Sequence, residues 1–453
     1  SHEVVRVLDG LIKVGGDPFV VGGTVRDFVF GRMHGNEIVA KDVDIEVFGL
    51  SGPQIMAVLE RFGIVNAAGN SFGVLKMRLA DGSDIDVSLP RRENSIGKGH
   101  RDFLVEPDPT MDFREAARRR DFSMNAMMWR FSTGEILDFF GGEDALRQGI
   151  LVHIDDKAFV EDPLRVIRAM QFMSRFCLNT HPHTIALCRR IVDTFGTLAK
   201  ERLREEWMKW AEKSVEPSRG LKFLRDCGWI AHFPELEDLV DCPQDPQWHP
   251  EGDAFTHTCH AVDAAARIAR EHELKDRDRL AVIFGTFCHD FGKPGTTHQR
   301  KGKWVSPGHA SAGVPITKRF LEKIDAPSWL VKQVTPLVRE HLCHVWWRGQ
   351  MPSDRVILRL ADNLSPATFR HLALVTEADV SGRPPFEGHS PMQEALARAA
   401  ELEVEAKKPK QILCGRHLIE EEFGFCLQPG PRVGKILRAA REAQLDREFF
   451  DEA

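Results

Sequence analysis

The 453-residue sequence contains no tyrosine, although phenylalanine occurs 29 times and aromatic residues together make up an ordinary 8%. No phenolic hydroxyl is therefore present to form a hydrogen bond. We interpret the imbalance as phenylalanine standing at positions where tyrosine is usual. Such a position keeps the packing of the ring and loses one hydrogen bond.

Other absences narrow the class of protein. No apolar run approaches the roughly 18 residues that span a bilayer, and no signal peptide is visible, so we expect a cytoplasmic protein with no membrane partner. The nine cysteines form no CxxC pair, which argues against a zinc finger or a disulfide framework. The net charge of −6 excludes a uniformly basic nucleic-acid coat.

The hydrophobic pattern changes near residue 145. Before it, short strands and a short helix that ends at Gly31 alternate, which predicts a small α/β domain with a half-exposed sheet; the strands are expected at 19–21, 41–48, 74–79 and 84–89. After it, the pattern is helical almost throughout. Residues 160–225 carry 13 Lys and Arg against 8 Asp and Glu, an excess that suits either a phosphate backbone or a solvated helical surface.

Acidic residues alternate with apolar ones along the strand expected at 41–48. Asp42, Asp44 and Glu46 share one face, because residues i and i+2 of a strand point the same way. Neighbouring carboxylates repel each other unless a cation neutralises them, and such oxygen ligands favour Mg²⁺ held partly by substrate phosphates. Asp86 has the same orientation on the strand at 84–89.

A glycine turn precedes these carboxylates. Gly22 and Gly23 lie between a strand and a helix, so the backbone can approach an anion closely, and Arg26 adds a fork of donors. Alone, such a turn is weak evidence for a site. A phosphate-binding turn opposite three carboxylates, however, indicates a two-metal phosphoryl- or nucleotidyl-transfer site.

These motifs resemble those of the class II tRNA nucleotidyltransferases, the CCA-adding enzymes and their bacterial poly(A) polymerase relatives. Further blocks follow in the family's order: a flexible loop, a ribose-contacting motif and a base-recognition motif, which are Arg91 to Phe103 with Gly97 and Gly99, Arg119 to Ala126, and Glu161 to Arg165 with Arg168. Two C-terminal segments, Pro429-Gly430-Pro431 and Gln444-Leu445-Asp446, are similar to the family's tail.

The resemblance implies a fold and a domain order. We expect an α+β nucleotidyltransferase head with a small mixed sheet, followed by an all-α neck, a helical body and a helical tail. The expected bounds are 1–145, 146–240, 241–400 and 401–453. It also implies catalytic roles for Asp42, Asp44 and Asp86, with Mg²⁺ bound by Asp42 and Asp44, and nucleotide binding by Gly22, Gly23, Arg26, Arg120, Asp121, Asn125, Glu161, Asp162, Arg165 and Arg168.

Base selection has a physical logic of its own. On one helix, Asp162 and Glu161 would share a face with Arg165, either as a plain salt bridge or as a pair facing a base. Cytosine and adenine both present an exocyclic N–H donor beside a ring-nitrogen acceptor, so one carboxylate and one guanidinium match both. Guanine and uracil present the reverse order. The protein itself can then replace a nucleic-acid template. We expect Asp121 to contact the ribose, with Asn125 on the same helical face.

A second constellation lies in the helical body. His257, the doublet His289-Asp290 and Asp379 resemble the four ligands of the HD-superfamily metal phosphohydrolases, and His309 and His341 lie between them in the chain. Imidazole and carboxylate together suit a divalent metal with positions open to water; its identity is not determined by the sequence. The resemblance implies phosphatase or cyclic phosphodiesterase activity, although such a site can also persist for stability alone.

Three functions therefore remain open. The first is template-independent addition of C and A to the 3′ end of tRNA, with CTP and ATP as substrates and the tRNA acceptor stem and elbow as the gripped surface. The second is an A-only adding enzyme or poly(A) polymerase of the same fold. The third is mainly an HD phosphohydrolase, which the presence of Asp42, Asp44 and Asp86 disfavours.

Overall fold

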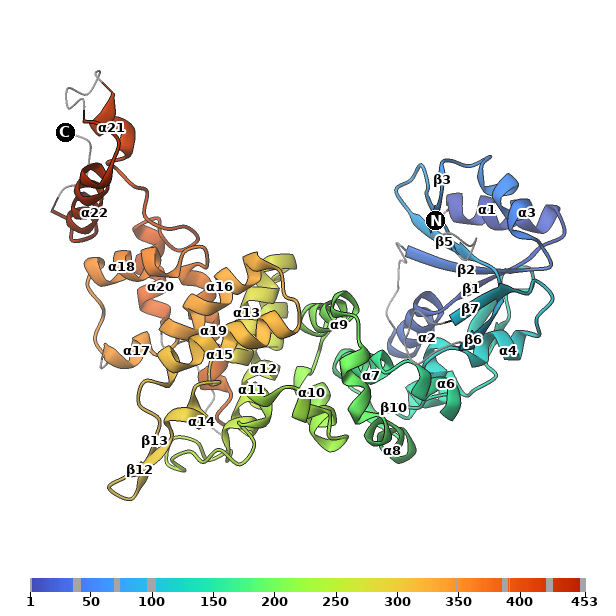
Figure 1. Ribbon diagram of the computed structural model, residues 1–453, viewed down its shortest axis with the longest axis horizontal. Helices are drawn as coiled ribbons and strands as arrows, with labels where there is room; N and C mark the ends of the chain where they lie inside the picture. The colour runs from blue at the N-terminus through green and yellow to red at the C-terminus, as the bar shows by residue number, and fades with distance from the viewer. Residues whose placement is uncertain are drawn as a thin grey trace. The chain divides into compact units, whose positions relative to one another are not determined.

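The computed structural model describes residues 2–35, 42–68, 74–95, 103–347, 349–384, 390, 392–420 and 427–448. The chain forms two compact units, Ser1–Glu206 with Lys222–His232, and Trp207–Leu221 with Phe233–Ala453. The first contains the mixed α/β head and the second is helical, as the predicted fold class requires (Figure 1). The predicted domain bounds at 145, 240 and 400 stay a prediction.

A seven-stranded sheet forms the centre of the first unit, in the order β3-β4-β5-β2-β1-β8-β9. Only β2 and β5 pair in parallel within it; the other pairs are antiparallel. The head elements are α1 (His2–Lys13), β1 (Asp17–Val21), α2 (Gly23–His34), β2 (Asp42–Phe48), α3 (Gly52–Leu59), β3 (Val65–Ala68), β4 (Val74–Arg78), β5 (Asp84–Ser88), β6 (Arg91–Ser95), β7 (Phe103–Pro107), α4 (Phe113–Arg118), the 3-10 helix η1 (Ser123–Asn125), β8 (Met128–Arg130), β9 (Ile136–Leu137) and α5 (Gly142–Arg147).

The alternation along β2 fixes which face of the sheet is buried. Val43, Ile45 and Val47 are buried on the face where α1 packs against β1 and α3 (Figure 1). The opposite face is covered only over part of its width, by the cluster that includes Phe19 and Met128. Asp42 is exposed beyond that cover, as expected for a half-open sheet.

Helix α2 is longer than predicted. It passes through Gly31 and ends at Gly35, which takes the left-handed conformation with φ of 69° and donates its N–H to the carbonyl oxygen of Gly31. A glycine inside a helix costs only about 1 kcal/mol, whereas the left-handed end of a helix specifically favours glycine. The terminating glycine is therefore the second one.

The segment that carries the base-recognition motif is not one helix. Helix α6 (Asp156–Glu161) ends before Pro163, and α7 (Leu164–Phe176) starts after it. Asp162 between them is extended, because a residue that precedes proline is disfavoured in helical conformation. The expectation that Glu161, Asp162 and Arg165 share one helical face is therefore wrong.

The remaining helices of the neck region carry the chain from one unit to the other. The boundary between the units falls within α9 and again within α10. The elements are β10 (Ile150–Leu151), β11 (Asn179–Thr180), α8 (Pro182–Arg190), η2 (Val192–Thr197), α9 (Lys200–Lys213), α10 (Pro217–Asp226) and η3 (Trp229–His232).

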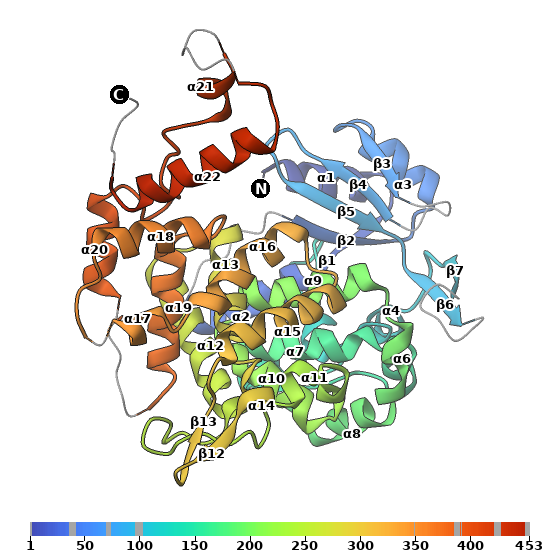
Figure 2. The ribbon, with the colours of Figure 1, turned by 60° about the vertical axis from the view of Figure 1, so that its left-hand side comes forward.

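The second unit is a bundle in which α12, α13, α16 and α19 pack against one another, with α15 beside α16. Figure 2 shows α22 running beside α18, and a small hairpin next to α14. Its elements are α11 (Pro234–Glu237), α12 (Ala254–Glu271), α13 (Asp276–Cys288), α14 (Lys293–Thr296), β12 (His298–Arg300), β13 (Lys303–Val305), α15 (His309–Lys323), α16 (Ser328–Glu340), α17 (Cys343–Trp346), α18 (Asp354–Leu364), α19 (Phe369–Ser381), α20 (Gln393–Glu401), α21 (Gly415–Ile419) and α22 (Pro431–Leu445).

Candidate active site and metal centre

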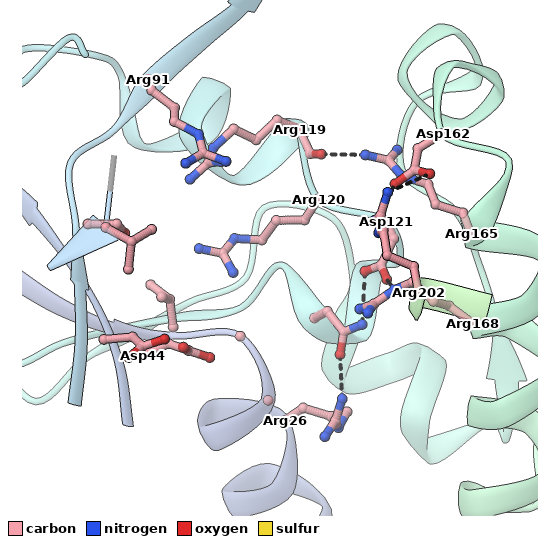
Figure 3. Close-up of a pocket in the computed structure, with 17 residues that line it drawn as sticks. Arg26, Asp44, Arg91, Arg119, Arg120, Asp121, Asp162, Arg165, Arg168 and Arg202 are labelled. Carbon is pink, nitrogen blue, oxygen red and sulfur yellow. Dashed lines mark hydrogen bonds and ion pairs between the residues drawn. The ribbon is translucent and has the colours of Figure 1, made fainter. Parts of the chain in front are cut away.

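A cavity of about 490 Å³ lies in the first unit, between the ends of the head strands and the start of α7. We call it the arginine-lined cavity, because seven arginines and four aspartates face it. Figure 3 shows Asp44 on the strand side, Arg120 projecting between, and Asp162 and Arg165 on the helical side. Its charged lining residues are Arg26, Asp44, Asp86, Arg91, Arg119, Arg120, Asp121, Asp162, Arg165, Arg168 and Arg202.

The carboxylates of β2 and β5 stand in register. Asp44 lies beside Asp86, and Asp42 lies beside Asp84, because the two strands are parallel neighbours. An adjoining cavity of about 480 Å³ is lined by all four. Burial raises the pKa of Asp44, and the positive charge of Arg120 partly offsets that effect. Carboxylate oxygens alone form this donor set, which fits a hard cation such as Mg²⁺.

Sequence reasoning missed Asp84 and did not anticipate the burial of Glu46. Asp84 repeats the i, i+2 spacing with Asp86 that singled out the pair on β2. Glu46 shares a strand face with Asp42 and Asp44, as expected, and is fully buried, with Arg119 and Arg120 as its ion-pair partners. This pairing explains its burial, since a buried carboxylate requires a compensating charge. Arg120 is thereby held over the strand end.

The glycine turn comes very close to the carboxylates. Gly22 has φ of 69°, and a Cβ atom added to it would lie 3.3 Å from Asp44 Oδ2 and 3.4 Å from Arg120 Nη1. The positive φ therefore favours glycine there, and a side chain would be in tight contact with Asp44. Arg26 lines the cavity, but its Nη1 donates to Asn125 Oδ1 at 2.8 Å and its Nε to Asp27 Oδ1 at 2.8 Å. Burial lowers the pKa of Arg26 to about 10.

Asp121 and Asn125 are in contact, although not on one helical face as expected, because Asp121 precedes the short 3-10 helix η1 that contains Asn125. Asn125 Nδ2 donates to Asp121 Oδ1 at 2.9 Å, and Arg168 Nε donates to Asp121 Oδ2 at 2.7 Å. Burial alone would raise the pKa of Asp121, but Arg168, Asn125 and Arg165 outweigh it and hold that pKa at about 2. The carboxylate is therefore charged and rigidly held at the cavity wall.

Asp162 and Arg165 both line the cavity, although their hydrogen bonds run to other partners. Arg202 Nη2 on α9 donates to Asp162 Oδ2 at 3.0 Å, and Arg165 Nη2 donates to the carbonyl oxygen of Arg119 at 2.8 Å. Arg202 was missed by sequence reasoning; its only signal is its place in the basic stretch 160–225. Glu161 does not line this cavity and instead lines a neighbouring one.

The flexible-loop motif falls partly on the hairpin of β6 and β7, where Arg91 reaches the arginine-lined cavity. Residues 96–102, with Gly97 and Gly99, lie outside the described residues.

In the second unit, the four predicted metal ligands come together and are buried. His257 Nε2 lies 3.2 Å from His289 Nε2 and 3.1 Å from Asp379 Oδ1, and His289 Nε2 lies 3.1 Å from Asp290 Oδ2. We call this group the histidine–aspartate centre. It includes two residues that the sequence reasoning did not assign as ligands: His309 Nε2 is 3.3 Å from Asp290 Oδ1 and 3.2 Å from His341 Nε2.

The four histidines of this centre share one arrangement. Each Nδ1 points at an acceptor outside the centre: Glu251 Oε1 for His257 at 2.8 Å, and the carbonyl oxygens of Thr286, Ser306 and Val338 for His289, His309 and His341 at 2.6 to 2.8 Å. With the proton on Nδ1, the Nε2 lone pairs converge. Convergent lone pairs beside two buried carboxylates fit a divalent metal.

Two family models match the chain. One describes the poly A polymerase head domain and matches residues 18–152; the other describes the HD domain and matches residues 254–367. The first segment includes Asp44 and the second includes His289, whereas Asp162, Arg165 and Asp379 lie outside both segments.

Curated relatives match nearly the whole chain. The multifunctional CCA protein of Xanthomonas campestris pv. campestris is 32% identical over 439 residues, which cover 94% of this chain and 97% of that protein. The multifunctional CCA protein of Methylococcus capsulatus is 30% identical and covers 95% of this chain and 94% of its own length.

Solved structures share the fold. The CCA-adding enzyme of Bacillus stearothermophilus in complex with CTP aligns with a TM-score of 0.65 at 21% identity, over 99% of this chain and 93% of that one. The CCA-adding enzyme of Thermotoga maritima in complex with tRNA aligns with a TM-score of 0.56 at 18% identity, over 99% and 92%.

Proposed function

The chain belongs to the multifunctional CCA protein family, and we propose that the arginine-lined cavity is where it performs the nucleotide addition of that family. It is a tRNA nucleotidyltransferase that adds C and A to the tRNA 3′ end without a nucleic-acid template. One observation carries the placement: the cavity joins the carboxylates of the head to the base-recognition motif.

In this proposal, Asp42 and Asp44 would hold Mg²⁺ beside Asp86, and the ion would lower the pKa of the tRNA 3′-hydroxyl and neutralise charge on the leaving pyrophosphate. The 3′-hydroxyl attacks the α-phosphorus of the nucleotide. The turn at Gly22 and Gly23 lets the backbone approach the triphosphate closely, and the surrounding arginines attract it. Arg26 acts through Asn125, because its donors are engaged there and with Asp27.

We assign the contact with the ribose 2′-hydroxyl to Asp121. Its Oδ1 accepts two hydrogen bonds, from the backbone N–H of Phe122 and from Asn125, whereas its Oδ2 accepts one from Arg168. An ionised carboxylate oxygen has a second acceptor site. Oδ2 can therefore accept a hydrogen bond from the 2′-hydroxyl, which separates ribonucleotides from deoxyribonucleotides.

We assign the selection of the base to Asp162 and Arg165. Asp162 accepts the exocyclic N–H of cytosine or adenine, and Arg165 donates to the ring nitrogen beside it. Arg202 positions Asp162, since it donates to one carboxylate oxygen. A site built this way rejects uracil and guanine because buried groups would stay unpaired.

The assay that tests the addition uses purified protein and tRNA that lacks its three terminal nucleotides. With CTP alone the tRNA should gain two C residues, and with CTP and ATP it should gain the full CCA end. Incorporation of A alone, with no use of CTP, would instead support the A-only alternative, which the family relationship does not favour.

The histidine–aspartate centre supports a second candidate function, a metal-dependent phosphohydrolase. The supporting observation is the convergence of four Nε2 atoms and two carboxylates within a buried cluster. The centre would bind one or more divalent ions, which activate water for attack on a phosphate ester. Release of phosphate from a phosphomonoester, or opening of a 2′,3′-cyclic phosphate, in the presence of added divalent metal tests it.

The proposed compartment is the cytoplasm. The eight cysteines among the described residues are free thiols, which fits a reducing environment. Among the described residues no helix is both long and apolar enough to cross a membrane.

We propose that the tail binds the tRNA elbow. Helix α22 has exposed basic side chains, which would contact the phosphates and the shape of the RNA.

A further inference from the structure

A third group of metal-ligating side chains lies in the first unit, outside the arginine-lined cavity and the histidine–aspartate centre. His153 follows β10, Asp156 opens α6, and His183 lies in the first turn of α8. His153 Nε2 is 2.9 Å from Asp156 Oδ1, and His183 Nε2 is 2.9 Å from Asp156 Oδ2. One ligand atom from each residue lies within 4.8 Å of the others.

Helix capping does not explain this arrangement. The cap of α6 is Asp155, whose side chain accepts the backbone N–H groups of Lys157 and Ala158. The cap of α8 is His181, whose Nδ1 accepts the backbone N–H of His183. The side chains of Asp156 and His183 are therefore not required at the helix ends, and they face each other and His153 instead.

His153 is the buried member of the group, and a hydrogen bond at its other ring nitrogen fixes the orientation of the ring. The His153 side chain is 5% exposed, and its Nδ1 lies 2.8 Å from Thr184 Oγ1, so Nε2 is held toward Asp156. With the His153 proton on Nδ1, toward Thr184, the Nε2 lone pair faces Asp156.

We propose that His153, Asp156 and His183 bind one divalent transition-metal ion of the Zn²⁺, Ni²⁺ or Co²⁺ class. Two imidazoles and one carboxylate favour these ions over Mg²⁺. Donor atoms of a tetrahedral site with metal–ligand bonds of about 2.0–2.1 Å stand about 3.3 Å apart, so the observed 2.9 Å contacts need only a slight opening. The side chains of Asp156 and His183 are about half exposed, so water can occupy the fourth coordination position of the ion.

The ion would tie the start of α6 to the start of α8. Helix α6 leads directly into Asp162 and the first turn of α7. A bond at Asp156 thus fixes the segment that presents the base-recognition residues to the arginine-lined cavity. The role is structural, and the ion stands apart from the catalytic carboxylates.

The test counts zinc bound by the full-length protein after equilibrium dialysis against Zn²⁺. Because the histidine–aspartate centre also takes metal, the count is compared between variants. His183→Ala and Asp156→Asn change half-exposed side chains and should fold. The matched control is His272→Ala. His272 is exposed and belongs to none of the metal-ligating clusters found among the described residues.

We expect His183→Ala and Asp156→Asn each to retain one equivalent of Zn²⁺ fewer than the wild type, and His272→Ala to retain the full number. His309→Ala, in the other centre, should lower the count independently, and its loss should add to that of His183→Ala. Full retention of zinc by either His183→Ala or Asp156→Asn, with circular dichroism like that of the wild type, would overturn the proposal.

Discussion

Asp44 on β2 lies directly beside Asp86 on β5, in a parallel pair of strands whose register also sets Asp42 beside Asp84. Four carboxylates thus line one face of the sheet at the strand ends that adjoin the glycine turn. Lys76 on the neighbouring strand β4 bonds Asp86 Oδ2 at 2.7 Å. We place the metal ion at Asp42 and Asp44, away from the carboxylate that Lys76 contacts.

The first prediction concerns base selection. In Arg165→Ala, the preference for CTP and ATP over UTP and GTP should fall by about a hundredfold or more, because the donor to the ring nitrogen is gone. The measurement compares kcat/KM for the four nucleotides on tRNA lacking its 3′ end. Arg190→Ala, which removes an exposed arginine on α8, should keep the wild-type preference. Equal selectivity in the two variants would contradict the assignment.

The second prediction concerns pH. Burial raises the pKa of Asp44, and Arg120 opposes that effect. Metal binding requires the charged carboxylate, so activity at limiting Mg²⁺ should fall as the pH drops, at a pH above the ordinary aspartate pKa of about 3.9. Removing the positive charge in Arg120→Met should raise the pKa further and move this loss of activity to higher pH.

The control for this shift is Arg202→Met, which removes an arginine of the same cavity that contacts Asp162 rather than Asp44. The activity of Arg202→Met should fall at the same pH as that of the wild type. If Arg120→Met lost activity at the wild-type pH or at a lower pH, Asp44 would not be the group that sets this loss.

Much of this site follows from the sequence, because its residues belong to strands with a period of two. The spacing of Asp42 and Asp44 placed both on one face, and the strand at 84–89 brought Asp86 beside them. The burial of the side chains on that face could not be predicted from the spacing. Glu46 obeys the same spacing and is fully buried, because two arginines from the distant segment around residue 120 neutralise it. Such a long-range pairing leaves no local pattern.

Asp162, Arg165 and Arg168 of the base-recognition motif line the arginine-lined cavity, but the helical geometry expected for the motif is wrong. A helical spacing was assumed across Pro163, although proline restricts the residue before it. The structure puts Asp162 in an extended conformation and gives it Arg202 as a partner, some 40 residues along the chain. In the second unit, the four ligands were predicted, whereas His309 and His341 joined them only through the packing of α15 and α16.

The third prediction concerns stability. Asp121 is buried and paired with Arg168, so Arg168→Met should destabilise the head by about 3–5 kcal/mol, because it leaves a buried charge without its partner. The double variant Asp121→Asn with Arg168→Met should lose less. Denaturant unfolding of the four proteins gives the coupling energy; strictly additive losses would contradict the pairing.

The same pair has a pH signature. The folded pKa of Asp121 is about 2, below the ordinary aspartate pKa of about 3.9. A depressed folded pKa stabilises the protein above the unfolded pKa, and this contribution is lost as the pH falls from about 4 toward 2. It should be absent from Asp121→Asn.

The fourth prediction separates the two chemistries. His289→Ala should abolish metal-dependent phosphohydrolysis and leave C and A addition unchanged, since the two sites lie in different units. Asp44→Asn should do the reverse, with addition falling by about a thousandfold because the metal contributes several kcal/mol to the transition state. Loss of both activities in either variant, with the fold intact, would contradict this separation.

The most direct measurement is the crystal structure of the full-length protein with CTP and Mn²⁺, in which anomalous scattering locates the metal. We predict a metal peak between the triphosphate and the carboxylates of Asp42 and Asp44, with the cytosine facing Asp162 and Arg165. A bound CTP with no metal at Asp44, or with its base turned away from Arg165, would contradict the proposed active site.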